Sequence, residues 1–237
     1  MIGSWCGRVV VYFFVLAAGA GLMSGPDRCY AAFDVHEDAF SISNAPGWCF
    51  AMAAFARWYY LTRHDAAPLR YVLDEGTQQR IAKELQGFYS KNLVKIQADY
   101  CNQHHERRME SFRRFLVGLA AGEPRIVLLM SRSTKGVVLH AVLAYAWLPD
   151  NQMIKVYDPN YCNEERFIDL ERKEYTSLDI TYNALCFPEV LHSNPGLVKK
   201  MESLFTTCAA VHGTVRRNGP VARPLVKRAQ MTRPATN

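Results

Sequence analysis

A turn followed by a helix that is apolar on most of its sides constrains this fold more than any other feature of the chain. Pro46-Gly47 favours a turn, and Asn44-Ala45 before it favours an extended approach. From Cys49 onward the residues are small or helix-forming, and the bulky ones are Phe50, Met52, Phe55 and Trp58. The pattern predicts a central helix that is packed on several sides, with Cys49 in its first turn.

A cysteine in the first turn of a helix is in a chemically active position. The thiol experiences the positive end of the helix dipole and lies near backbone N–H groups that have no partner within the helix. Both features favour the thiolate, which is the reactive form of cysteine. The same N–H groups can hold the oxyanion of a tetrahedral intermediate. Cys49 is therefore the candidate nucleophile of the chain.

The order of helical and strand-like patterns predicts the fold class. Helical patterns occupy 51–62, 77–89 and 98–121, with Thr77 as a candidate N-cap. After Gly122 the period changes to that of strands, at 125–131, 137–147 and 153–157, with further short strands at 166–170 and 177–182 and a last helix at 196–205. Helices first and antiparallel strands second predict an α+β fold rather than alternating βαβ units.

One histidine is embedded in an apolar strand. His140 lies within Val138–Leu143, and Asp158 follows the next predicted strand, after a turn near Asp150-Asn151. In such a hairpin the start of one strand lies beside the end of the next, so the two side chains are expected at the same end of the sheet. A lone buried histidine is by default a satisfied core residue. A carboxylate on Nδ1 would instead orient the ring and leave Nε2 free to take the Cys49 proton.

Three short blocks resemble the catalytic blocks of papain-like cysteine peptidases, most closely the bacterial C39-like branch. They are Gly47-Trp48-Cys49-Phe50-Ala51-Met52, His140-Ala141-Val142-Leu143-Ala144-Tyr145 and Val156-Tyr157-Asp158-Pro159-Asn160. The resemblance implies a papain-like α+β fold, with Cys49 as the nucleophile and His140 as general base and then acid. Asp158, or alternatively Asn160, would be the orienting residue. The reaction it implies is hydrolysis of peptide or protein substrates through a thioester, with no cofactor or metal.

The chain departs from the family near the nucleophile. The family commonly has a glutamine a few residues before the cysteine as oxyanion donor, whereas this chain offers Ser43 and Asn44. We favour Asn44, because an amide NH₂ is the better donor. Trp48 replaces the small polar residue that often precedes the cysteine, which leaves the width of the cleft open. Two alternatives stay open: a papain-fold acyltransferase or deamidase that uses the same triad, and a non-catalytic binding module.

The two ends of the chain predict export and a solvated tail. Arg8 precedes an uncharged stretch that is too short to span a membrane, so residues 1–32 are interpreted as a signal peptide and 33–212 as the catalytic domain. An uncleaved membrane anchor is the alternative. Residues 213–237 carry six Lys or Arg and no Asp or Glu, so the net charge of +6 belongs to this tail. It is expected to be disordered, with contact to an anionic surface as a secondary possibility, and nothing in the body predicts nucleic-acid binding.

The remaining cysteines and histidines suggest structural rather than metal-binding roles. Cys49, Cys101, Cys162, Cys186 and Cys208 follow the predicted signal peptide, and Cys162–Cys186 is the disulfide we favour. Adjacent His104 and His105 point about 100° apart on a helix, and no second ligand cluster with zinc spacing occurs. We therefore expect no metal site.

Overall fold

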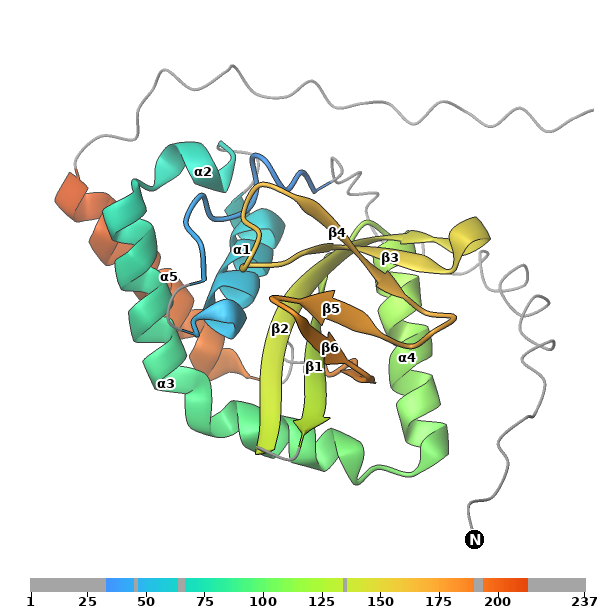
Figure 1. The fold of residues 1–237 in the computed structure, drawn as a ribbon. Helices are drawn as coiled ribbons and strands as arrows, with labels where there is room; N and C mark the ends of the chain where they lie inside the picture. The colour runs from blue at the N-terminus through green and yellow to red at the C-terminus, as the bar shows by residue number, and fades with distance from the viewer. Residues whose placement is uncertain (1–32, 45–46, 64–66, 134–135, 190–193, 213–237) are drawn as a thin grey trace, which may run out of the picture. The chain divides into compact units, whose positions relative to one another are not determined.

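The computed structural model describes residues 33–44, 47–63, 67–133, 136–189 and 194–212 (Figure 1). All of them fall within one compact unit, Tyr30–Lys227. The predicted signal peptide and basic tail lie outside the described residues, as do Ala45 and Pro46 of the predicted turn. Within the described part of the chain, no helix combines the length and the apolar character needed to cross a membrane.

The predicted central helix is confirmed as α1, Cys49–Arg63. Every residue from Phe50 to Tyr60 is buried, Arg57 included. Helix α1 packs on one side against α3 (Glu75–Cys101) and α5 (Pro195–His212). It also packs against strands β1 (Arg125–Ser133) and β2 (Gly136–Leu148), so it lies between these two helices and the sheet (Figure 1). Apolar residues on all sides of the helix are therefore accounted for by partners on all sides.

The helices begin and end at residues other than those predicted. After the short α2 (Leu69–Val72), α3 runs through Glu75–Cys101, and its N-cap is Asp74, which accepts from the Thr77 backbone N–H at 2.9 Å. Thr77 is therefore not the cap. The single helix predicted over 98–121 is wrong, because α3 ends at Cys101 and α4 (His105–Ala120) begins after a break. Asn102 in that break is a weak helix former.

The five-stranded sheet is antiparallel, in the order β4-β3-β2-β1-β7. Its strands are β1 (Arg125–Ser133), β2 (Gly136–Leu148), β3 (Met153–Tyr157), β4 (Glu165–Asp169) and β7 (Ala184–Cys186). A 3-10 turn, η1 (Pro149–Asn151), joins β2 to β3, and Gln152 follows it in the left-handed region. The predicted hairpin of β2 and β3 is thus present, and the mixed α+β class is confirmed.

A second, two-stranded sheet replaces the single strand predicted over 177–182. It consists of β5 (Tyr175–Ser177) and β6 (Ile180–Tyr182). Leu178 and Asp179 form the connection, and both have positive φ, 47° and 62°. Two residues with positive φ form the type I′ turn that suits a tight hairpin. The last helix, α5 (Pro195–His212), is longer than the sequence pattern indicated.

The cysteines do not follow the predicted pairing. The five cysteines in the described residues are free thiols, so the disulfide expected between Cys162 and Cys186 is not formed. The Cys162 sulfur lies 3.9 Å from the Ser43 hydroxyl. Cys186 is instead the neighbour of Cys101, with which it shares a hydrogen bond, and burial is the main cause that raises the pKa of Cys186 to about 12.

Candidate active site

The start of α1 presents Cys49 at a helix N-terminus. The Trp48 carbonyl accepts from the Met52 N–H at 3.0 Å, which makes Cys49 the first helical residue. Gly47 reaches this start with φ of +87°, a region that side-chain-bearing residues rarely adopt. The third N–H of the helix, from Ala51, donates to Gln86 Oε1 of α3 at 3.2 Å. The half-buried Cys49 thiol thus lies at the positive end of α1, whose first turn is held to α3 by Gln86.

His140 and Asp158 form a buried pair on the sheet. The His140 Nε2 and Asp158 Oδ1 atoms are 2.7 Å apart, and the two residues are 4% and 0% exposed. The register explains the contact. Leu143 pairs with Tyr157 across β2 and β3, so a continued ladder would place Val142 opposite Asp158. His140 and Val142 share a face of the strand, and His140 is therefore the diagonal neighbour of Asp158.

The ring nitrogens are used in the opposite way to the sequence-based expectation. Asp158 bonds Nε2, and the imidazole also hydrogen-bonds the Cys49 thiol, so Nδ1 is the nitrogen that serves Cys49. The predicted assignment of Nδ1 to the carboxylate is wrong. The sequence places Asp158 beside His140 but does not determine which edge of the ring faces it, and in the structure that edge carries Nε2.

Burial and charge act in opposite directions on His140. Burial lowers its pKa, but the hydrogen bonds and charges of Asp158 and Cys49 outweigh burial and raise the pKa to about 9. For Asp158, burial raises the pKa, whereas the hydrogen bonds from His140, Tyr175 and Asn160 hold it below its usual value. At neutral pH the site therefore contains an imidazolium between a carboxylate and the Cys49 sulfur, the charge arrangement that activates a thiol.

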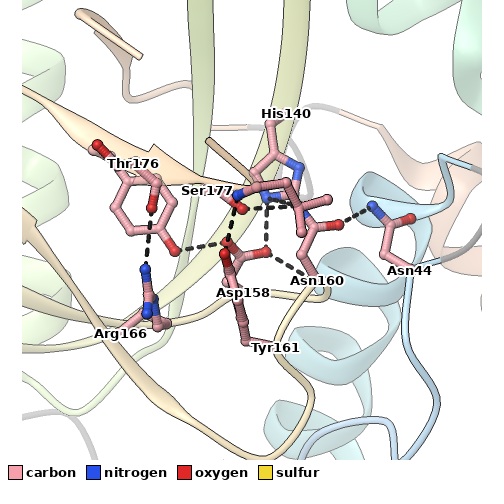
Figure 2. Close-up of polar contacts among 10 residues, drawn as sticks. Asn44, His140, Asp158, Asn160, Tyr161, Arg166, Thr176 and Ser177 are labelled. Atoms are coloured by element: carbon pink, nitrogen blue, oxygen red, sulfur yellow. Dashed lines mark hydrogen bonds and ion pairs between the residues drawn. The ribbon is translucent and has the colours of Figure 1, made fainter. Parts of the chain in front are cut away.

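Asn160 connects this pair to the segment before the nucleophile. Figure 2 shows Asn44, Asn160 and Ser177 in a row beside His140 and Asp158. The Asn44 side-chain NH₂ donates to Asn160 Oδ1 at 2.8 Å, and the Asn160 NH₂ donates to the Ser177 hydroxyl at 2.8 Å. Asn160 Nδ2 is 3.4 Å from His140 Nε2, farther than the Asp158 oxygen, so Asp158 is the nearer of the two partners of the ring.

Asn44 is brought to the site, but its amide already has one partner. Its backbone N–H donates to the Pro159 carbonyl at 2.8 Å, which ties the segment before Cys49 to the loop after β3. Its side-chain oxygen is buried without a hydrogen-bond partner among the described residues. The amide has two hydrogens and Asn160 takes one, so the second remains for another acceptor. Ser43, the other candidate, is exposed and lies beside Cys162.

Two residues of the site had no signal in the sequence. The Tyr175 hydroxyl donates to Asp158 Oδ2 at 2.6 Å, and the Ser177 hydroxyl accepts from Asn160. Both come from β5, whose position beside the main sheet no local pattern indicates. The predicted strand over 177–182 covered only one of them, and it gave no reason to place that residue near His140.

The histidines next to Cys101 belong to a helix start, with His104 as the N-cap of α4 and His105 as its first residue. Among the described residues, no group of three or more His, Cys, Asp or Glu side chains is arranged to hold a metal ion. Comparison with known proteins found no match for this chain among family models, curated proteins or solved structures.

Proposed function

We propose that this chain is a cysteine peptidase of papain-like fold that hydrolyses peptide (amide) bonds. The observation that carries the proposal is the buried His140–Asp158 pair, 2.7 Å apart, with the same imidazole bonded to a thiol at a helix N-terminus. Nucleophile, base and orienting residue come from α1, β2 and the end of β3, which is the arrangement that thiol catalysis needs. The predicted signal peptide would direct the enzyme out of the cytoplasm.

The reaction follows from the positions of these groups. The Cys49 thiolate attacks the carbonyl carbon, and the oxyanion lies on the Cys49 backbone N–H and the second amide hydrogen of Asn44. His140 gives its Nδ1 proton to the leaving nitrogen, the C–N bond breaks, and a thioester remains. His140 then takes a proton from water, whose oxygen attacks the thioester and releases the acid and the Cys49 sulfur.

The test is alkylation by iodoacetamide at about pH 5.5, where ordinary thiols are almost fully protonated. Cys101 and Cys162 are half-buried, as Cys49 is, and so serve as controls within the same molecule. Peptide mapping is expected to show Cys49 labelled at least tenfold faster than either control. In His140→Ala this advantage is expected to disappear, because no imidazolium remains to stabilise the thiolate.

Equal labelling of the three thiols in the wild-type protein would contradict the proposal and leave a binding module as the better reading. A positive result is followed by profiling with peptide libraries and with side-chain amides. Cleavage of backbone amides supports a peptidase, and release of ammonia or transfer to an amine supports the deamidase or acyltransferase alternative. Cys49→Ala and His140→Ala are expected to lose about a thousandfold or more of either activity.

A further inference from the structure

The carboxylate of Asp158 is supported from behind by a residue of the small sheet. Its Oδ1 accepts from His140 Nε2 and, at 2.8 Å, from the Asn160 backbone N–H. Its Oδ2 accepts from the Tyr175 hydroxyl at 2.6 Å. Asp158 is fully buried and Tyr175 is 3% exposed. A charge at such a position is stable only if hydrogen bonds replace its lost hydration, and on Oδ2 that hydrogen bond comes from Tyr175.

The Tyr175 hydroxyl donates to Asp158 because an ionised carboxylate can only accept, and Arg166 of β4 interacts with the same hydroxyl. The Arg166 side chain bonds the Tyr175 hydroxyl. A guanidinium can only donate, so the hydroxyl oxygen must accept from Arg166 and its single hydrogen must point to Asp158. Asp158 therefore accepts from Tyr175 on one oxygen and from His140 on the other. Burial and the Asp158 charge hold the pKa of Tyr175 well above its usual value, so Tyr175 remains a donor at any working pH.

Arg166 is itself held in place by neighbours. Its guanidinium carbon lies 4.3 Å from the centre of the Tyr161 ring, and its NH2 group donates to the Thr176 carbonyl at 3.2 Å (Figure 2). Thr176 follows Tyr175 on β5, so one guanidinium contacts two successive residues of the small sheet. The arrangement positions β5 against the end of β3 and keeps the Tyr175 hydroxyl directed at Asp158.

We propose that Tyr175, backed by Arg166, is a positioning residue that keeps Asp158 ionised and directed at His140, and so sets the acidic limit of Cys49 reactivity. The inference rests on the proposed thiol chemistry and adds the residue that regulates its pH range. Removing one of the hydrogen bonds to a buried carboxylate favours its protonated form. A protonated Asp158 no longer supports the imidazolium beside Cys49, so fast labelling of Cys49 is lost at a higher pH. The ionisable groups that face Asp158 are His140 from β2, Tyr157 from β3, Tyr175 from β5 and Tyr182 from β6.

The test is the pH profile of iodoacetamide labelling at Cys49 in Tyr175→Phe. We expect its acidic limb to move up by about one pH unit, which is a tenfold loss of labelling rate on that limb. The matched control is Tyr182→Phe. Tyr182 is the cross-strand partner of Tyr175 and is equally buried, at 3% exposed. Among the described residues, no hydrogen bond joins the Tyr182 hydroxyl to Asp158. The acidic limb of the pH profile of Tyr182→Phe is therefore expected to stay at the wild-type position.

Arg166→Gln is the second variant, because it leaves the Tyr175 side chain itself unaltered and removes only the group that positions it. The acidic limb of the pH profile of this variant is expected to move up as well, but by a smaller amount, about a threefold loss of labelling rate. Thermal unfolding identifies variants that fail to fold, and if Tyr175→Phe is one of them, Arg166→Gln decides alone. An acidic limb that stays at the wild-type position overturns this inference while the proposed function stands. Absence of fast Cys49 labelling in the wild-type protein overturns the proposed function instead.

Discussion

At the scale of single residues, the site is defined by the hydrogen-bond partners of each polar group. His140 divides its two nitrogens between Asp158 and Cys49, and Asp158 divides its two oxygens between the main and the small sheet. Asn44 gives one amide hydrogen to Asn160. The remaining hydrogen of Asn44 is the group whose role a substitution can isolate.

Asn44→Ala is expected to separate amide hydrolysis from alkylation. Hydrolysis passes through an oxyanion, and loss of one donor to it is expected to lower kcat by about a hundredfold. Alkylation by iodoacetamide forms no oxyanion, so the labelling rate of Cys49 should remain near that of the wild type. The measurement compares the two rates on the same preparation, with Ser43→Ala as the control because its side chain is exposed and lies beside Cys162. An equal fall in both rates would show that Asn44 only positions Asn160.

At the scale of elements, the hairpin of β5 and β6 carries two roles. It places Tyr175 against Asp158 and Ser177 against Asn160, and it turns through Leu178 and Asp179, which both have positive φ. Leu178 is also 58% exposed, so it gains little from burial in return for its unfavourable backbone conformation.

Replacing Leu178-Asp179 by Asn-Gly is expected to stabilise the protein by about 1 kcal/mol, because this pair is the one that type I′ turns favour. The free energy of unfolding in urea measures the gain. The reverse control is Gly47→Ala, at the other position of positive φ next to the site, where the same measurement should show a loss of about 1 kcal/mol or more. Unchanged stability in the Asn-Gly variant would mean that the turn is not strained.

The sequence predicts those parts of the site that depend on local order. Cys49 was identifiable because a turn signal precedes an apolar helical pattern, and Asp158 because hairpin pairing places strand ends beside strand starts. Tyr175 was not identifiable, because the position of β5 beside β3 depends on tertiary contacts such as that of Arg166 with Tyr175. The ring nitrogens of His140 were misassigned for a similar reason. Their use depends on which edge of the ring faces Asp158, and pairing of neighbouring strands does not determine that.

At the scale of the whole molecule, the charged site makes stability depend on pH. The folded pKa of His140, about 9, lies above the ordinary value of 6.5. Its contribution is therefore complete below about pH 6.5 and is lost as pH rises through 9. Asp158 behaves in the opposite way, and its contribution is lost as pH falls below the ordinary value of 3.8. Burial raises the pKa of Asp38 to about 6, so Asp38 is mostly ionised below the pH range in which His140 loses its proton.

The stability difference between the wild type and His140→Gln is expected to shrink by up to about 3 kcal/mol between about pH 6.5 and pH 9.5. Urea unfolding of both proteins at several pH values measures this difference. Thiols that both proteins share contribute equally to both stabilities, so their effect cancels in the difference. In a Cys49→Ala background the change should be smaller, because one of the two partners that raise the His140 pKa is gone. A difference that does not vary with pH would show that His140 is neutral in the folded protein.

The bond between Asn44 and Asn160 joins positions that are 116 residues apart. During synthesis the thiol of Cys49 therefore leaves the ribosome long before the imidazole, the carboxylate and the tyrosine that activate it. Contacts of such long sequence separation form late in folding, because the intervening chain must be ordered first. Until then Cys49 is an ordinary thiol, chemically inert towards amides. The hydrolysis proposed above can therefore begin only after the segment around Asn160 has been made and ordered.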